Sequence, residues 1–445
     1  MERDYLIKRA PMKALLIFAA PIILGNLFQQ TYTMADSAIV GKFVSEQALA
    51  AIGACYALTT IFIYIASGGG IGASVLVSRY FGAKDYSRMK NVISTALITF
   101  FGISILLGGF GLLFGRSIMV ALKTPADALD MAVEYLNIYF MGLPFLFMYN
   151  VLSAMFNALG KSRIPLYFLI FSSVFNVALD WVLVRHFNLG IAGVAWATLI
   201  AQSISALLSF FVLMASLKKI EGKCNRLFVP EEMGPMFRIA LPSILQQSTV
   251  SIGMMLVQSV VNSFGSEMLA GFSAAMRVQA LCAVPMIGIG NAVSSYTAQN
   301  LGAKQHERVV QGYHAANKLV MIFAALNLII LEPFNQQIIS LFLGEDRTEL
   351  AMQTGCAYLT FIGFFFCVVG CKMAVDGLLR GAGDMKMFTI ANLINLSVRV
   401  LVAKLCAPIW GIQMVWIAVP IGWFVNWVIS YAEYRTGKWK RIAEQ

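Results

Sequence analysis

Charged residues are scarce in this chain of 445 residues, and their scarcity excludes several classes of protein. Asp, Glu, Lys and Arg make up 12% of the sequence, whereas 59% of it is hydrophobic and the mean hydropathy is +0.75. A soluble domain carries about 25% charged residues. The composition therefore excludes an ordinary soluble domain and indicates a protein that crosses a membrane many times.

Histidines and clustered cysteines are also scarce. The three histidines, at positions 186, 306 and 314, lack metal-binding spacing, and the sequence contains no Ser/His/Asp or Cys/His arrangement. The seven cysteines are scattered; Cys367 and Cys371 share a helical face, but no histidine joins them. The sequence therefore predicts neither an enzyme nor a protein with a resident metal or cofactor.

Long apolar stretches predict twelve membrane-spanning helices, because about 20 mostly apolar residues cross the hydrocarbon core. The stretches start near residues 14, 49, 91, 131, 164, 190, 233, 269, 312, 350, 387 and 411. With both termini cytoplasmic, Lys and Arg concentrate in the inner segments, which is the positive-inside pattern. The outer segments hold only Lys42, Arg116, Lys123, Arg185, Arg347 and Lys404. The net charge of +11 is then a topology signal, and it predicts no nucleic-acid partner.

Short motifs recur in the same order in the two halves of the chain. Pro21 has a counterpart in Pro242, and Gly82-Ala83-Lys84 recurs as Gly302-Ala303-Lys304. Because each half has an even number of spans, the repeat predicts two six-helix bundles related by a pseudo-two-fold axis along the membrane normal. The predicted N-lobe, cytoplasmic linker and C-lobe are residues 1–217, 218–232 and 233–445.

Two carboxylates lie inside predicted spans, where an ionisable side chain costs roughly 2.5–3.5 kcal/mol on insertion scales. Asp36 lies in the first span and Asp180 in the fifth. Asn176 shares a helical face with Asp180, and Thr198 of the sixth span lies at a similar depth. Their oxygen atoms suit a proton or a hard cation such as Na⁺. The alternative is that both acids only satisfy neighbouring helices through water and hydroxyl groups.

The second half offers other charged residues inside its spans. Asp376 of the tenth span precedes Arg380 by four residues, and this spacing predicts an ion pair within one helix. Arg277 and Arg399 also lie within spans. We expect each to be a structural partner of carbonyls or polar side chains, and contact with a substrate is the alternative.

Over its whole length the chain resembles the multidrug and toxic compound extrusion (MATE) family. The resemblance is carried by Pro21, Asp36 and Gly41 and by three loop motifs: Gly82-Ala83-Lys84, Gln299-Asn300-Leu301-Gly302-Ala303 and Leu379-Arg380-Gly381-Ala382-Gly383-Asp384. It implies two six-helix bundles flanking a central cleft. The DinF-like branch is the most similar one, and its N-lobe cation site maps onto Asp36, Asn176, Asp180 and Thr198. Pro21 matches a proline associated with helix bending in that branch, and a passive kink is the alternative.

The resemblance implies an antiporter that couples the entry of H⁺, Na⁺ or both to the export of amphipathic, often cationic, compounds by alternating access. Gln29, Gln246 and Gln247 are candidates for the substrate cavity. We expect a monomer in the bacterial cytoplasmic membrane, with small amphipathic molecules and membrane lipid as partners. A flippase for a lipid-linked oligosaccharide is an alternative from the same superfamily.

Overall fold

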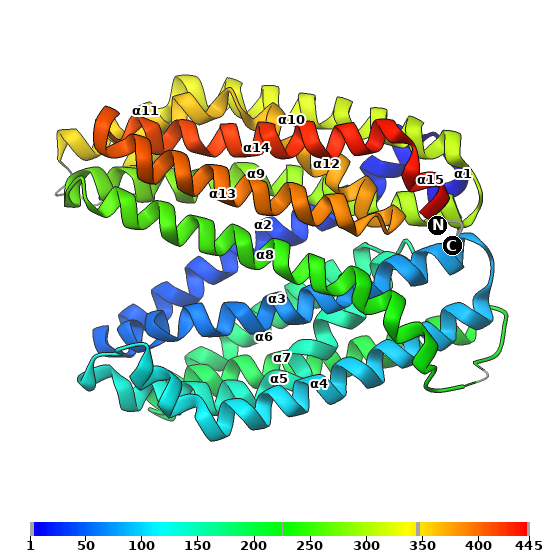
Figure 1. The fold of residues 1–445 in the computed structure, drawn as a ribbon. Helices are drawn as coiled ribbons and strands as arrows, with labels where there is room; N and C mark the ends of the chain where they lie inside the picture. The colour runs from blue at the N-terminus through cyan, green and yellow to red at the C-terminus, as the bar shows by residue number, and fades with distance from the viewer. Residues whose placement is uncertain (1–3, 225, 344–347, 443–445) are drawn as a thin grey trace. The chain divides into compact units, whose positions relative to one another are not determined.

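In the part of the chain that the computed structural model describes, helices are the only regular secondary structure, and short turns and loops connect them (Figure 1). That part is residues 4–224, 226–343 and 348–442, without the side chains at positions 34–43, 46, 49 and 442. The first half contains α1 Tyr5–Lys8, α2 Pro11–Phe43, α3 Glu46–Gly82, α4 Tyr86–Ala121, α5 Ala126–Ala158, α6 Arg163–Asp180, the π-helical η1 Trp181–His186 and α7 Gly190–Lys218. The second half contains the 3₁₀ turn η2 Pro230–Glu232, α8 Met233–Asn262, α9 Ser266–Gly302, α10 His306–Ser340, α11 Glu349–Gly363, α12 Phe366–Ala382, α13 Met385–Trp410, α14 Gln413–Thr436 and α15 Lys438–Ile442.

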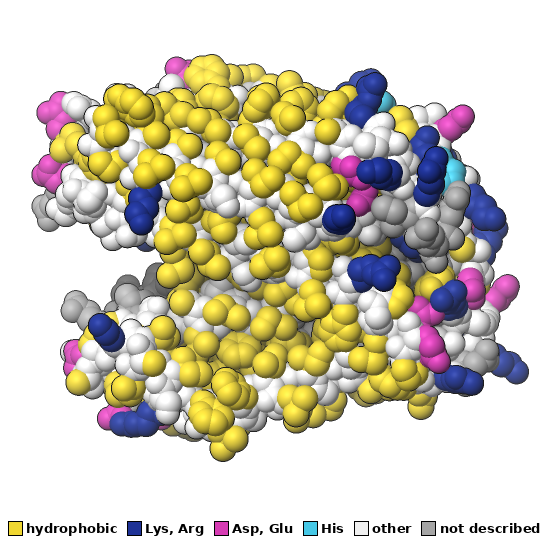
Figure 2. Space-filling view, in the orientation of Figure 1, with side chains coloured by type: hydrophobic (Ala, Val, Ile, Leu, Met, Phe, Trp, Pro, Cys, Tyr) yellow, Lys and Arg dark blue, Asp and Glu magenta, His cyan; other side chains and the backbone are white. Residues whose placement is uncertain are grey.

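The helices confirm the predicted all-α membrane fold. Within the described residues, eleven helices are long and apolar enough to cross a membrane, and α11 with α12 forms a twelfth candidate span that is bent by 52°. On the face shown in Figure 2, hydrophobic side chains cover the middle of the helices, whereas Lys and Arg lie mainly near helix ends. This is the distribution that a hydrocarbon layer selects, because charged side chains are costly at its centre.

Local capping explains where several helices begin and end. The hydroxyl of Ser45 accepts the backbone N–H of Ala48 at 3.0 Å and starts α3, and the carboxylate of Asp85 accepts the N–H of Arg88 at 3.0 Å and starts α4. The repeated Gly-Ala-Lys motif ends α3 and α9 in the same way, with Lys84 at φ 60° and Lys304 at φ 59°. The sequence repeat is therefore also a repeat of backbone geometry.

The chain divides into two compact units. The N-terminal unit is Leu24–Ile244, and the C-terminal unit is Met1–Ile23 together with Leu245–Gln445. Two helices are consequently shared. Residues 11–23 of α2 belong to the C-terminal unit, and residues 233–244 of α8 belong to the N-terminal unit. The units thus differ from the predicted lobes at these two helix ends, and the lobe boundaries stay a prediction.

In each unit an arginine holds the segment that enters the shared helix. In the N-terminal unit, Nε of Arg88 pairs with Oε1 of Glu232 at 2.6 Å, directly before α8. In the C-terminal unit, a guanidinium nitrogen of Arg308 donates to the carbonyl of Arg9 at 2.6 Å, directly before α2. Arg88 and Arg308 each follow the last glycine of the preceding helix by six residues, so the repeat places the same clamp in both units.

Glycines bring two helices of the C-terminal unit into backbone contact. A Cβ atom on Gly377 of α12 would overlap the carbonyl oxygen of Gly290 of α9, and one on Gly381 would overlap that of Ser294. Small residues at helix crossings allow such close approach in membranes, where packing rather than the hydrophobic effect drives association. The α9–α12 pair is therefore a rigid support for the side chains that α12 carries.

Candidate functional site

Asp180 ends α6 in the N-terminal unit and is fully buried. The next six residues, Trp181–His186, continue the helix as a π-helix, in which each turn holds an extra residue. Such segments are rare and recur at functional sites, because they displace side chains from their ordinary helical positions. Asn176, one turn before Asp180, is 2% exposed. The predicted acid and amide are therefore both enclosed by protein.

Asn176 connects three helices around this acid. Since a carboxylate needs a donor, the amide nitrogen of Asn176 faces Asp180 and donates to its Oδ2 at 3.1 Å. The amide oxygen accepts the backbone N–H of Thr198 in α7 at 3.0 Å. The same amide nitrogen contacts the hydroxyl of Tyr32 in α2. The hydroxyl of Thr198 donates to the carbonyl of Val194 at 3.1 Å, so its oxygen retains lone pairs for a further partner.

The structure thus brings together three of the four residues predicted for the cation site. Asn176, Asp180 and Thr198 converge, whereas the side chain of Asp36 lies outside the described part of the structure. Tyr32 is an additional residue of this cluster that the sequence analysis missed. The spacing in the sequence could have identified it, because Tyr32 precedes Asp36 by four residues and positions four apart share a face of a helix.

A small cavity lies beside Thr198, between α5 and α7. Its polar lining comes from Tyr135 and Tyr139 of α5 and from Thr198 and Gln202 of α7. The hydroxyl of Tyr139 is already used, because it donates to the carbonyl of Thr59 in α3 at 3.1 Å. The cavity therefore adds hydroxyl and amide groups on the side of Thr198 that faces α5.

The other predicted residues occupy different parts of the fold. Pro21 is buried within α2, two residues before the end of the segment that belongs to the C-terminal unit. Gln29 is exposed and belongs to the N-terminal unit. Gln246 and Gln247 are half-buried in α8 and belong to the C-terminal unit. Among the described residues, the amide nitrogen of Gln247 has no hydrogen-bond partner.

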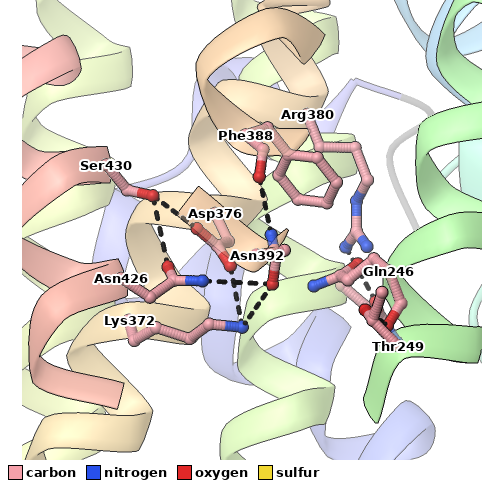
Figure 3. A network of polar contacts seen from close by, with 10 residues as sticks. Gln246, Thr249, Lys372, Asp376, Arg380, Phe388, Asn392, Asn426 and Ser430 are labelled. Carbon is pink, nitrogen blue, oxygen red and sulfur yellow. Dashed lines mark hydrogen bonds and ion pairs between the residues drawn. The ribbon is translucent and has the colours of Figure 1, made fainter. Parts of the chain in front are cut away.

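A second polar cluster lies in the C-terminal unit, on α12, α13 and α14 (Figure 3). Nζ of Lys372 pairs with Oδ2 of Asp376 at 2.9 Å, and their side chains are only 2% and 3% exposed. Asn392 accepts from Lys372 at 3.2 Å, and Ser430 donates to Asp376 at 2.8 Å. Asn426 links the two neutral partners, donating to Asn392 at 3.1 Å and accepting from Ser430 at 3.3 Å.

This cluster corrects one prediction from the sequence. Asp376 does form an ion pair within its helix, but the partner is Lys372 rather than Arg380. Both basic residues lie four positions from Asp376, so spacing alone could not choose between them. Arg380 instead turns to α9, where it donates to Asn291 at 2.8 Å and to Ser294 at 3.4 Å. Lys372 was missed, although a lysine inside an apolar helix is itself a signal.

Comparisons with known proteins agree with this arrangement of two related halves. The profile of the family described as MatE matches residues 21–182 and again residues 242–405. The chain is 29% identical to the probable multidrug resistance protein YpnP of Bacillus subtilis, with 97% of this chain and 96% of that protein covered. It is 22% identical to the multidrug export protein MepA of Staphylococcus aureus, with 93% and 92% covered.

A solved structure shows the same fold over the full length. It is the outward-facing conformation of a multidrug resistance MATE family transporter of the MOP superfamily, with a TM-score of 0.91, 22% identity, and coverage of 100% of this chain and 99% of that one. The two profile matches cover more than half of the sequence and begin at Pro21 and Pro242, the landmarks of the internal repeat. This multi-pass membrane protein therefore belongs to the MatE family of multidrug and toxic compound extrusion transporters.

Proposed function

We propose that this protein exports amphipathic, often cationic, compounds in exchange for H⁺, Na⁺ or both. The family and the names of its relatives support drug export. The observation that carries the coupling is the complete burial of Asp180 beside neutral oxygen-bearing groups. Burial makes a carboxylate costly unless a proton or cation neutralises it. A site that is stabilised by an incoming cation in one state and not in the other couples two fluxes.

The neighbours of Asp180 suit such a cation. The carboxylate supplies charge and the hydroxyl of Thr198 supplies a neutral oxygen atom, the kind of ligand that a hard cation prefers. The amide nitrogen of Asn176 faces Asp180 in this structure, so Asn176 would offer its oxygen atom to Na⁺ only after its amide turned over. We place Asp36 in the same site because its position on α2 follows Tyr32 by one turn. A proton needs only the carboxylates, whereas Na⁺ needs the additional oxygen atoms.

Two prolines support alternating access. Pro21 and Pro242 each lie two residues before the point at which a shared helix passes from one compact unit to the other. A proline removes one backbone hydrogen bond and makes a helix easier to bend there. We infer that α2 and α8 bend near these points as the transporter changes state. We also propose that the protein acts as a monomer.

The test is export from proteoliposomes under an imposed pH or Na⁺ gradient, with a cationic dye as substrate. Asp180→Asn should abolish gradient-driven export but leave the protein folded, because the amide retains the shape and loses the charge. The matched control is Asp130→Asn, which changes an exposed acid paired with Arg116 in the same unit. Export by Asp180→Asn at the rate of the control would end the proposal.

The same vesicles distinguish the flippase alternative. A flippase would move a lipid-linked oligosaccharide between leaflets, and its transport would not depend on Asp180 under a cation gradient.

Topology is tested separately by labelling from each side of bacterial cells. With both termini in the cytoplasm, the exposed native Cys224 should react only from inside, and a cysteine at the exposed Lys123 only from outside. Labelling of both from one side would contradict the proposed orientation.

A further inference from the structure

Arg399 of α13 is a buried cation for which the described part of the structure shows no ion-pair or hydrogen-bond partner. Its side chain lies in the C-terminal unit and is 6% exposed. Among the residues that the structure describes, no carboxylate pairs with it and its Nε has no hydrogen-bond partner. The expectation that it bonds carbonyls or polar side chains is therefore not met. An unsatisfied buried guanidinium is costly, and each such group in a native protein calls for an explanation.

The surrounding helices leave room for this side chain. A Cβ atom on Gly422 of α14 would lie 2.5 Å from Cγ of Arg399. One on Gly253 of α8 would lie 2.9 Å from Leu396 and 3.9 Å from Nη1 of Arg399. Glycines on two neighbouring helices thus border the guanidinium and its stem, and any larger residue at Gly422 would displace the arginine.

Other unpaired polar atoms lie near Arg399. Oδ1 of Asn395, one turn earlier on α13, also has no partner among the described residues. The same is true of Nε1 of Trp416 on α14, whose ring centroid lies 5.8 Å from that of Tyr358. Tyr358 interacts electrostatically with Arg399, and its hydroxyl donates to the amide oxygen of Gln279. Two unused donors and two aromatic rings therefore belong to one buried region of this unit.

The internal repeat shows what this region corresponds to in the N-terminal unit. Gly160 and Gly383 end equivalent helices in the left-handed conformation, with φ of 72° and 80°. Asn176 follows Gly160 by 16 residues, and Arg399 follows Gly383 by the same number. Likewise, Tyr32 and Gly253 each follow their proline by 11 residues. Arg399 thus takes the place of Asn176, and Gly253 takes the place of the tyrosine that contacts it.

The two corresponding regions carry opposite net charge. Asp180 follows Gly160 by 20 residues, and the residue at the same distance from Gly383 is Ala403, which is 1% exposed. The C-terminal unit thus has a guanidinium where the N-terminal unit has an amide, a methyl group where it has a carboxylate, and a glycine without a side chain where it has a phenol. A region of this composition suits an anion rather than a cation.

We propose that Arg399 binds the carboxylate of an amphipathic aromatic compound, so that aromatic carboxylates are a substrate class of this protein. A planar guanidinium matches the two oxygens of a carboxylate, and desolvation strengthens the pair. Tyr358 and Trp416, which are 0% and 9% exposed, are the aromatic side chains of this buried region against which the apolar body of the ligand would pack. That the ligand is exported rests on the proposed function, whereas the binding itself does not.

Binding of a matched pair of fluorescent probes to the purified full-length protein tests this site. Pyrenebutyrate carries the carboxylate, and pyrenebutyramide has the same shape without the charge. The wild-type protein should bind the acid about tenfold more tightly than the amide, because the amide offers one neutral acceptor, whereas the carboxylate neutralises the guanidinium and accepts from it with both oxygens. Arg399→Gln should remove this preference. Arg277→Gln, which changes an exposed arginine of the same unit, should retain it.

A second pair of variants keeps the test decisive if Arg399→Gln does not fold. Ala403→Asp places a carboxylate one turn after Arg399, where it satisfies the guanidinium internally and should abolish the preference for the acid. Ala403→Asn has the same size without the charge and should retain the preference. Equal binding of acid and amide by the wild-type protein, or an unchanged preference in Ala403→Asp, would overturn the assignment.

The binding test is independent of the coupling test, because it uses no gradient. Wild-type protein that prefers the acid but exports no dye under a gradient would contradict the proposed function and support the arginine site. Wild-type protein that exports the dye but binds acid and amide equally would do the reverse. Pyrenebutyrate export from proteoliposomes that is lost in Ala403→Asp but retained in Ala403→Asn would support both the arginine site and the proposed export function.

Discussion

Tyr32 touches the amide through which Asn176 holds Asp180, so its hydroxyl helps to position the site. We predict that Tyr32→Phe lowers the apparent affinity for the coupling cation about five- to tenfold, since one hydrogen bond contributes about 1 kcal/mol. The measurement is export rate against pH and against Na⁺ concentration. A merely structural role would change the rate at all pH values equally, whereas a positioning role shifts the profile. Tyr167→Phe, at an exposed position of α6, is the control and should leave the profile unchanged.

The ion pair of Lys372 and Asp376 makes a prediction about stability. Lys372→Met leaves a buried carboxylate without its cation and should destabilise the protein by about 3–5 kcal/mol. Adding Asp376→Leu removes the unpaired charge and should restore most of the loss. Thermal unfolding in detergent measures both. Arg116→Met breaks the exposed pair with Asp130 and should cost no more than about 1 kcal/mol. A double variant as unstable as Lys372→Met would contradict the explanation.

Single residues also show which parts of the site could be predicted from the sequence. Asn176, Asp180 and Thr198 were predicted together because helical spacing and depth in the membrane already place them near one another. Tyr32 and Lys372 could not be assigned in this way. The phenol of Tyr32 reaches across to another helix, and Lys372 is favoured over Arg380 by its contact with Asn392 on a neighbouring helix. Such choices depend on side chains that only the folded protein brings together.

At the scale of helices, the contact between α9 and α12 can be tested with one methyl group. Gly377→Ala should destabilise the protein by about 1–3 kcal/mol, because the new Cβ would overlap the carbonyl oxygen of Gly290 and push the helices apart. Gly102→Ala in α4 adds the same methyl group where nothing lies within 4 Å. There it should cost nothing, since alanine is the better helix former. Equal melting temperatures of the two variants would show that the close crossing is not needed.

The junction at which α12, α13, α14 and α15 meet is expected to respond to pH. Burial, and then the nearby carboxylate of Glu433, raises the pKa of Asp384 from 3.8 to about 6, although Lys438 opposes this shift. The folded protein therefore holds this proton to a higher pH than the unfolded chain does. Its stabilising contribution is complete below about pH 3.8 and is lost as the pH rises through about 6.

Thermal unfolding between about pH 4 and pH 8 checks this expectation. The wild-type melting temperature should carry a component that falls with rising pH. The corresponding free energy of unfolding can fall by at most about 1.4 kcal/mol per pH unit for one proton. Asp384→Asn should remove that component and stabilise the protein at neutral pH. Asp130→Asn, at an exposed acid, should leave the slope unchanged. A slope that is the same in Asp384→Asn would assign it to other groups.

Helix positions were largely predictable, and their irregularities were not. The predicted starts agree with the structure, from no difference at residue 190 to six residues at α10, because long apolar runs bounded by charges define spans. The break between Gly363 and Phe366 and the π-helix after Asp180 went unpredicted. Both begin within apolar stretches, and hydropathy does not report on backbone hydrogen bonding.

At the scale of the whole molecule, the sequence predicted two related halves but not the exchange of helix ends between the compact units. A repeat shows that two segments are alike, whereas it does not show which neighbours each end packs against. In the structure, Ile23 lies against Gly288, and Ile244 lies against Gly68. These pairs join α2 to α9 in the C-terminal unit and α8 to α3 in the N-terminal unit.

This exchange has a consequence for biosynthesis. As the ribosome makes the chain from its first residue, the N-terminal unit becomes complete only after residue 244, beyond the start of the second half. Residues 5–23 are among the first to be made, yet their partners Gly288 and Arg308 follow much later. The early segment must therefore wait in the membrane unsupported, and we expect a fragment 1–217 produced alone to be degraded. Co-production with fragment 218–445 should rescue it, and pulse-chase labelling would measure both lifetimes; a fragment that is equally long-lived alone would show that the first helix does not depend on its late partners.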